Sequence, residues 1–373
     1  MESLDIEKWS VAKGNAKVEA FLSRPAFAPE AEAAAAVVLA DIRKRGNAAV
    51  LAAAKKFDGA ALTAKTMVVT EAEFKAAAAA VPAHIKRAVK EAHQRVKTFA
   101  TAGLREPWYI QTPQGGYTGE FFTPMDRVGV YIPGGTAPLA STSVMTVTLA
   151  KAAGVPQIVA CTPCREDKTV NPVLLYALKV AGATEVYKVG GIQAIGLMAF
   201  GTQTVRPVQK IAGPGNAFVT AAKRQVYGFV AIDQVAGPSE IAVLADKKVN
   251  AAWVAADLLS QAEHGSGHEK ALLVTDSQEM AGRVIDEIEW QLPKLSRRAL
   301  VERVINNKGM MIAVTPDLKQ GMELVNRFAP EHFEIMTKDA DKRVDQVRAA
   351  GAVFVGEWTP EPAGDFVAGP SHV

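Results

Sequence analysis

Cysteine, histidine and long hydrophobic runs are all scarce in this sequence. Two cysteines and six histidines occur in 373 residues, and a single cysteine pair cannot close a zinc site. No run reaches the ~18 apolar residues that a membrane-spanning helix needs. The best candidate, Met145 to Ala160, is interrupted by Lys151 and Pro156. We therefore expect no transmembrane segment.

An excess of charge of one sign is missing too. The 42 basic and 39 acidic side chains are interspersed and leave a net charge of +3. This provides no basic stripe for a phosphate backbone, so nucleic acid is not an expected partner. The opening Met-Glu-Ser-Leu-Asp-Ile-Glu lacks the basic and apolar regions of a signal peptide, and a cytoplasmic protein is expected.

The composition that remains is typical of a folded enzyme. Hydrophobic residues make up 49% and charged residues 22%, a balance that does not indicate disorder. At roughly 150 residues per domain, the length predicts two or three domains. Cys161 and Cys164 form an isolated Cys-Thr-Pro-Cys pattern at the end of an apolar run. A redox or metal-binding pair is one interpretation, and we favour the other, reduced thiols buried at a strand end.

The pattern of the chain changes from helical to alternating. Residues 31–45 and 47–57 are rich in alanine, with charges at helical spacing. Thr70-Glu-Ala-Glu73 has the form of a capping box that opens a longer helical stretch, which Pro82 is expected to kink or divide. From Arg127 onward, short β-branched segments alternate with helical ones. The expected strands are 127–133, 157–161, 185–190, 210–212, 229–232, 240–244, 271–275, 311–314, 333–336 and 352–355.

This alternation predicts an α/β protein with mostly parallel sheets that are covered on both faces. Two tandem, incomplete Rossmann-like units, preceded by an N-terminal helical region, account for the two series of strands. Residues 127–237 are expected to form one unit. Residues 1–126 together with 238–373 are expected to form the other.

Glycine-rich loops follow several of these strands. They are Ile132-Pro-Gly-Gly135, Val189-Gly-Gly191, Ala212-Gly-Pro-Gly-Asn216 and Ala236-Gly-Pro-Ser239. In open parallel sheets, ligands bind beyond the carboxyl ends of the strands, where helix N-termini offer amide donors to anions. A nucleotide or phosphate crevice is one interpretation. Tight turns without a ligand are the other, because no loop carries the dinucleotide fingerprint.

A candidate ligand pair lies on the helix expected over Asn250 to His264. Gln261 and His264 are i and i+3 neighbours, with Cβ atoms about 5 to 6 Å apart, and can converge on one ligand. The alternative is that His264 interacts with the last carbonyls of its helix.

Glu331 and His332 follow Pro330 at the start of an expected strand. They are either a base with its carboxylate partner or a chance pairing. Asp365 lies in a segment rich in proline and glycine and is either a metal ligand or a turn residue. Amide, imidazole and carboxylate groups together suit a divalent metal and proton transfer.

Taken jointly, these segments resemble the histidinol dehydrogenase family from about Arg43 to Val373. The resemblance is carried by long phrases in one order, which are Arg127-Val-Gly-Val-Tyr-Ile-Pro-Gly-Gly135, Lys188-Val-Gly-Gly-Ile-Gln-Ala-Ile195, Gly213-Pro-Gly-Asn-Ala-Phe218, Ala236-Gly-Pro-Ser-Glu240, Asp257-Leu-Leu-Ser-Gln-Ala-Glu-His264 and Ala329-Pro-Glu-His332. Several such phrases are far more specific than a short motif.

The resemblance implies a role for each matching residue. The NAD contacts would be Tyr131, Gln193 and Asn216, in the unit formed by 127–237. The zinc ligands would be Gln261, His264 and Asp365, and the catalytic pair Glu331 and His332. The substrate contacts would be Ser239, Gln261, His264, His332, Asp365 and His372.

The family oxidises L-histidinol to L-histidine through histidinaldehyde, the last step of histidine biosynthesis, with two NAD for each histidinol. The resemblance implies that His332 takes the hydroxyl proton and that Glu331 activates the water for the second step. Zinc would hold the imidazole and amine of the substrate, which is a positioning role. A homodimer is implied as well.

One feature departs from the family pattern. Members continue past the counterpart of Gly369-Pro-Ser-His-Val373 into a helical arm, which reaches the partner subunit and brings a further zinc-binding histidine and a substrate-binding glutamate. This sequence stops there. Either it is part of a longer chain or the protein lacks the arm, in which case we expect weak or no turnover. A dehydrogenase of another small polyol and a non-catalytic remnant are the alternatives.

Overall fold

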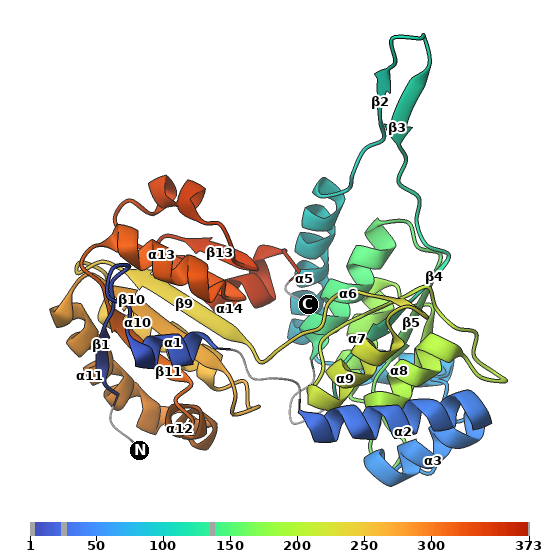
Figure 1. Ribbon diagram of the computed structural model, residues 1–373. Helices are drawn as coiled ribbons and strands as arrows, with labels where there is room; N and C mark the ends of the chain where they lie inside the picture. Colours follow the sequence, from blue (N-terminus) through green and yellow to red (C-terminus); the bar gives the residue numbers. More distant parts are fainter. Residues whose placement is uncertain (1–3, 24–27, 135–138, 372–373) are drawn as a thin grey trace. The chain divides into compact units, whose positions relative to one another are not determined.

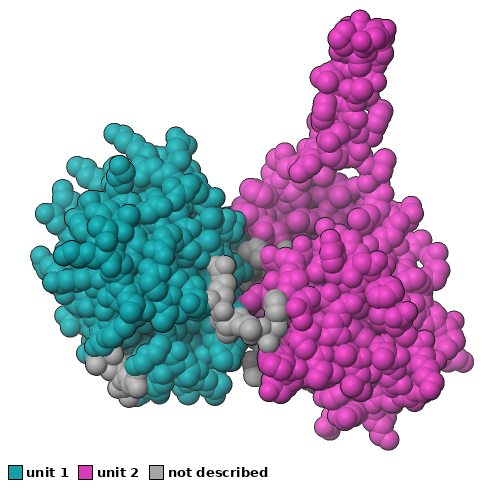
Figure 2. All heavy atoms as spheres, viewed as in Figure 1, with its two compact units in different colours: residues 1–26, 238–364, 372 teal, residues 27–237, 365–371, 373 magenta. Residues whose placement is uncertain are grey.

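The chain folds into two compact units, which have different colours in Figure 2. The computed structural model describes residues 4–23, 28–134 and 139–371, with the backbone alone at 365 and 366. Of these, unit 1 contains 4–23 and 238–364, and unit 2 contains 28–237 and 365–371.

A six-stranded sheet, parallel throughout, forms the centre of unit 1 (Figure 1). Its strands lie in the order β1-β11-β10-β9-β12-β13. Along β9, Ile241 and Val243 face one hydrophobic core while Ala242 and Leu244 face the other, as alternation in a strand requires. The strands are β1 (Ile6–Lys8), β9 (Glu240–Ala245), β10 (Lys270–Thr275), β11 (Met310–Val314), β12 (His332–Met336) and β13 (Ala352–Val355).

Helices cover both faces of this sheet. Helices α10, α11 and α12 share one core with it, and α1 and α13 share the other. Because α10 connects the parallel strands β9 and β10, its last turn lies at the edge where the strands begin, here called the amino edge. The remaining elements are α1 (Ala16–Leu22), α10 (Ala251–Ala262), α11 (Gln278–Gln291), η1 (Leu292–Lys294), α12 (Arg298–Asn306), α13 (Leu318–Phe328), η2 (Ala340–Gln346) and α14 (Glu361–Ala363).

Unit 2 is built on a five-stranded parallel sheet in the order β6-β5-β4-β7-β8. Its strands are β4 (Arg127–Tyr131), β5 (Gln157–Cys161), β6 (Glu185–Tyr187), β7 (Lys210–Ala212) and β8 (Ala231–Ile232). Each of the ten expected strands is therefore present in one of the two sheets, within a few residues of the predicted bounds. The π-helical turn η3 (Gly364–Ala368) follows α14.

In the described part of unit 2, eight helices pack against this second sheet or against the helices that cover it. They are α2 (Pro29–Arg45), α3 (Asn47–Asp58), α4 (Glu71–Ala80), α5 (Ala83–Ala102), α6 (Ala140–Ala152), α7 (Pro172–Ala181), α8 (Gly191–Phe200) and α9 (Ala217–Val226). The capping box at Thr70 is confirmed, and Pro82 divides the predicted helical stretch into α4 and α5.

The N-terminal helical region belongs to a different unit from the one that we predicted. We expected residues 1–126 to belong with 238–373, whereas 28–126 pack with 127–237. The reason is the apolar face of α2, where Leu39 and Ile42 enter the same core as Ile195 of α8 and Ile211 of β7. Alanine content and charge spacing predicted a helix here, but they do not indicate which sheet the helix packs against.

Three strands in the predicted helical region were missed. β1 joins the edge of the unit 1 sheet, and β2 (Trp108–Gln111) pairs with β3 (Tyr117–Glu120) in an antiparallel hairpin. The hairpin projects from unit 2 beyond the end of α5 (Figure 1). No helix within the described ranges is long and apolar enough to cross a membrane.

Candidate functional site

The amino edge of the unit 1 sheet brings Gln261 and His332 into contact. Gln261 is in the last turn of α10, His332 is the first residue of β12, and both side chains are buried. Nδ1 of His332 lies 2.9 Å from Oε1 of Gln261. Because an amide oxygen only accepts, Nδ1 carries the hydrogen and Nε2 keeps its lone pair. His332 is thereby held in the tautomer that can act as a base through Nε2.

The exposed side chain of His264 contacts the same glutamine. Its Nδ1 lies 3.3 Å from Nε2 of Gln261 and 3.1 Å from the main-chain oxygen of Gln261. The predicted i, i+3 contact is therefore present, and so is the contact with a helix-end carbonyl that was its alternative. When Nδ1 donates to that carbonyl, Nε2 is available to a metal, an arrangement that histidine ligands commonly adopt.

Glu331 and Ser239 lie at the same edge. Glu331 directly precedes β12, and its Oε2 accepts from the backbone N–H of Glu240 at 3.4 Å. Ser239 precedes Glu240 at the start of β9. Four predicted side chains, those of Gln261, His264, Glu331 and His332, thus lie where the central strands of unit 1 begin.

Two predicted residues cannot be placed at this edge. Asp365 lies in the π-helical turn η3, where the structure describes its backbone and not its side chain. His372 lies outside the described residues. Among the side chains that are described, no three from His, Cys, Asp and Glu cluster closely enough to hold a metal. Gln261 still provides an amide oxygen, which contacts His332, and His264 provides an imidazole that contacts the amide nitrogen of Gln261. An amide oxygen and an imidazole fit part of a zinc ligand set.

Three buried carboxyl groups behind His332 were missed by the sequence analysis. They belong to Asp257 of α10, Glu334 of β12 and Glu361 of α14, and each is at most 6% exposed. Oε1 of Glu334 accepts from the N–H of Glu361 at 2.7 Å, and Ser260 donates to Oε2 of Glu361 at 3.4 Å. Oε1 of Glu361 lies 3.7 Å from Nδ1 of His332. The imidazole therefore has a carboxyl group as well as an amide on its Nδ1 side.

Burial dominates the ionisation of two of these acids. It raises the pKa of Asp257 to about 6, against the smaller opposing effect of its hydrogen bond with Glu334. Burial, followed by the neighbouring charge of Asp257, raises the pKa of Glu334 well above its ordinary value. Two carboxyl groups in contact do not both ionise readily, so the pair shares a proton near neutral pH.

In unit 2, Tyr131 and Gln193 lie at the opposite edge, where the strands end. The hydroxyl of Tyr131 accepts from the N–H of Gly191 at 3.1 Å, and burial raises its pKa to about 12. Nε2 of Gln193 donates to Oδ2 of Asp58 at 3.1 Å. Asp58, which the sequence analysis missed, also accepts from the N–H of Gly190, and burial raises its pKa.

Asn216 lies at the next loop of this carboxyl edge. Its Oδ1 caps α9 by accepting from the N–H groups of Phe218 and Val219, each at 3.1 Å. Its amide NH₂ group is not used by that cap and remains a donor for a ligand. The three predicted cofactor contacts therefore lie at the carboxyl edge, with Tyr131 at the end of β4, Gln193 in α8 after β6 and Asn216 in the glycine loop after β7.

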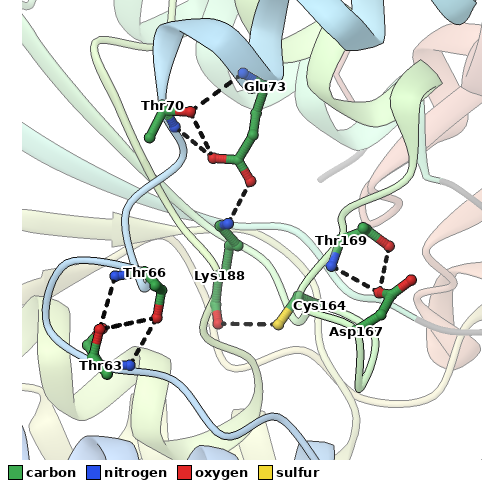
Figure 3. A network of polar contacts seen from close by, with 8 residues as sticks. All are labelled: Thr63, Thr66, Thr70, Glu73, Cys164, Asp167, Thr169 and Lys188. Carbon is green, nitrogen blue, oxygen red and sulfur yellow. Dashed lines mark hydrogen bonds and ion pairs between the residues drawn. The ribbon is translucent and has the colours of Figure 1, made fainter.

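The loop after β6 is fixed by a buried lysine, shown in Figure 3. Lys188 forms an ion pair with Glu73, which is also the capping-box acid of α4. Burial opposes the ionisation of Glu73, but the bonds with Lys188 and Thr70 outweigh it and lower the pKa. The thiol of Cys164 lies 3.8 Å from the carbonyl oxygen of Lys188. The side chain of Lys188 is thus held by α4, and its carbonyl oxygen is in contact with Cys164.

The cysteine pair is inert by position. Cys161 and Cys164 are both buried free thiols, and burial raises both pKa values. A thiolate is the reactive form, so neither side chain is activated. The prediction of reduced thiols at a strand end is confirmed.

The comparisons with known proteins all indicate the same family. A sequence model of the histidinol dehydrogenase family matches residues 23–373. The histidinol dehydrogenase of Symbiobacterium thermophilum is 43% identical over 350 residues, which cover 94% of this chain and 79% of that protein. The one from Xanthomonas campestris pv. campestris is 40% identical and covers 100% of this chain and 85% of its own length.

A solved structure agrees. The crystal structure of histidinol dehydrogenase from Elizabethkingia anophelis superposes with a TM-score of 0.92 at 35% identity. The match covers 99% of this chain and 84% of that one.

Proposed function

The chain belongs to the histidinol dehydrogenase family and is an oxidoreductase of histidine biosynthesis that acts on histidinol, and we propose that it uses NAD and zinc to do so. The observation that carries the catalytic part is the contact between Nδ1 of His332 and Oε1 of Gln261. It orients an imidazole as a base at the same edge as the candidate metal ligands.

The proton transfers are assigned to His332. Oxidation of an alcohol requires loss of the hydroxyl proton as hydride leaves the carbon, and Nε2 of His332 is the group that takes it. The same histidine, once protonated, is stabilised by Glu361, whose carboxyl oxygen lies 3.7 Å from Nδ1. NAD, when bound, accepts the hydride.

The second oxidation requires water to add to the aldehyde. Glu331 is assigned the role of activating that water, because its carboxylate lies at the amino edge beside the start of β9. The backbone N–H of Glu240 holds one carboxylate oxygen, which leaves the other to accept a proton from water.

Zinc is assigned to Gln261, His264 and Asp365. The first two residues are in contact through the amide nitrogen of Gln261 and Nδ1 of His264. They would supply an amide oxygen and an imidazole, and Asp365 would supply a carboxylate. These residues would hold the ion, which would supply a positioning contact to the imidazole and amine of the substrate, and Ser239 and His372 would contact the substrate as well. Tyr131, Gln193 and Asn216 are assigned to NAD at the carboxyl edge of unit 2.

The test is the formation of NADH from histidinol and NAD by the purified chain. We expect two NADH for each histidinol consumed, loss of turnover after treatment with a chelator, and recovery on addition of Zn²⁺. Oxidation of histidinol with a different acceptor in place of NAD would contradict the cofactor assignment. Full activity of a protein shown to be free of metal would contradict the zinc assignment.

A homodimer is also proposed, and the β2–β3 hairpin supports it. All residues of both strands are exposed, among them Trp108, Tyr109 and Tyr117. An isolated two-stranded hairpin is marginal in water, and exposed aromatic clusters mark protein interfaces. Light scattering should give twice the mass of the chain, and the mass of a single chain would contradict the proposal.

A further inference from the structure

A buried lysine lies beneath the loop Gly213–Asn216 of unit 2. Lys223, on α9, is 2% exposed, and its Nζ donates to the carbonyl oxygen of Gly213 at 2.8 Å. Asp233, which follows β8, forms an ion pair with this lysine. Its Oδ2 also accepts from the N–H of Gly213 at 2.7 Å. The ion pair therefore holds both backbone polar groups of one glycine.

Gly213 is a position where the backbone is tightly constrained. Its φ of 122° lies in a region that side chains rarely permit, and a Cβ there would be 2.1 Å from the carbonyl oxygen of Tyr131. The loop is thus pressed against the end of β4, and its first residue is bonded to both members of the Lys223–Asp233 pair. Three residues further on, Asn216 caps α9, the helix that carries Lys223.

Stability alone is a poor explanation for this pair. Removing an ammonium group from water is costly, and apolar side chains of similar volume often stabilise a fold as well as a buried ion pair does. Unit 2 contains a comparable pair, Arg127 with Glu185, with side chains 7% and 35% exposed. That pair lies at the amino edge, where β4 and β6 begin, away from the glycine loops.

We propose that Lys223 and Asp233 are positioning residues for the cofactor. They fix Gly213–Asn216 in advance, so that the loop backbone and the free amide of Asn216 meet the dinucleotide without reordering. Preorganisation of this kind improves affinity by avoiding an ordering cost on binding. The inference rests on the proposed use of NAD by unit 2, and it assigns these two residues an effect on NAD binding rather than on turnover.

The experiment compares two double variants of the full chain. Lys223→Met with Asp233→Ala removes the pair beneath the loop, and we expect KM for NAD to rise roughly tenfold while kcat and KM for histidinol change less than about twofold. Arg127→Met with Glu185→Ala removes the matched pair at the opposite edge. It should lower the melting temperature but leave KM for NAD unchanged.

Amide hydrogen exchange over residues 210–217, measured without ligand, tests the effect on the loop independently of the effect on NAD binding. Exchange should accelerate in the Lys223/Asp233 variant and not in the Arg127/Glu185 variant. Unchanged exchange, an unchanged KM for NAD, or an equal rise of KM in both variants would overturn the positioning role. If the unaltered protein neither binds nor uses NAD, the proposed function fails, and the exchange comparison still decides whether the pair fixes the loop.

Discussion

The two parallel sheets present their candidate residues at opposite edges. In unit 2, Tyr131, Gln193 and Asn216 lie where strands end, as ligand sites in open α/β sheets usually do. In unit 1, Glu331, His332 and the last turn of α10 lie where strands begin. The usual rule for parallel sheets thus agrees with the position of the candidate residues in unit 2 and not with that of the candidate residues in unit 1.

The difference has an electrostatic consequence. The carboxyl edge of unit 2 presents the N-termini of α8 and α9, whose partial positive charge suits a pyrophosphate. The amino edge of unit 1 presents the C-terminus of α10, whose partial negative charge suits a metal ion or a cationic substrate. The two edges are therefore suited to ligands of opposite charge.

The largest effect should come from His332, the proposed catalytic base in unit 1. His332→Asn removes Nε2 while an amide can still meet Gln261, and we expect kcat to fall about 10²- to 10⁴-fold, the usual contribution of general acid–base catalysis. Binding of NAD, measured by calorimetry, should not change because the residues proposed to contact NAD are in unit 2. Unchanged turnover in a folded variant would remove His332 from the mechanism, and weakened NAD binding would break the division between the units.

A second effect concerns the pH dependence of stability. Since the pKa of Glu334 is raised, its stabilising contribution is complete below the ordinary value near 4.5 and is lost as pH rises towards its folded pKa. Glu334→Gln cannot ionise and still accepts from the N–H of Glu361. From pH 5 towards neutral pH, its stability relative to the unaltered protein should therefore improve in thermal unfolding, by at most about 1.4 kcal/mol for each pH unit.

The matched variant in unit 2 should behave with the opposite sign. The bond with Arg127 lowers the pKa of Glu185, so its contribution is present above the ordinary pKa and is lost as pH falls. Glu185→Gln should therefore be destabilising at pH 7 and much less so near pH 4. The same pH trend in both variants would show that the buried acids of unit 1 are not held in their neutral form.

The smallest effect separates a cofactor contact from a helix cap. Asn216→Ala and Asn250→Ala each remove an asparagine that caps a helix, α9 in unit 2 and α10 in unit 1. Each should cost about 1 kcal/mol of stability. Only Asn216→Ala should also raise KM for NAD, by roughly fivefold, as loss of one hydrogen bond of about 1 kcal/mol predicts. An equal KM for NAD in both variants would mean that Asn216 is a cap and nothing more.

The sequence was most informative where local spacing decides geometry. The contact of Gln261 with His264 follows from helical spacing, and the capping box at Thr70 follows from residue identity. The hairpin was missed although its signal is present, since Pro113-Gln-Gly-Gly116 separates two short segments rich in aromatic and β-branched residues.

The burial of side chains by segments distant in the chain could not be predicted from the sequence. Asp58, Asp257, Glu334 and Glu361 are ordinary acids by position, and their properties arise because helices and strands far along the chain remove them from water. Which sheet α2 packs against is likewise determined by long-range packing, in the core that α2 shares with α8 and β7. Such long-range packing leaves no periodic signal in a single sequence.

The most direct test is the tautomer of His332, read from its ¹⁵N chemical shifts and assigned by comparison with His332→Asn. The bond to Oε1 of Gln261 predicts hydrogen on Nδ1 and a lone pair on Nε2. Hydrogen on Nε2 in the neutral ring would contradict this orientation, and with it the assignment of His332 as the base at the amino edge of unit 1.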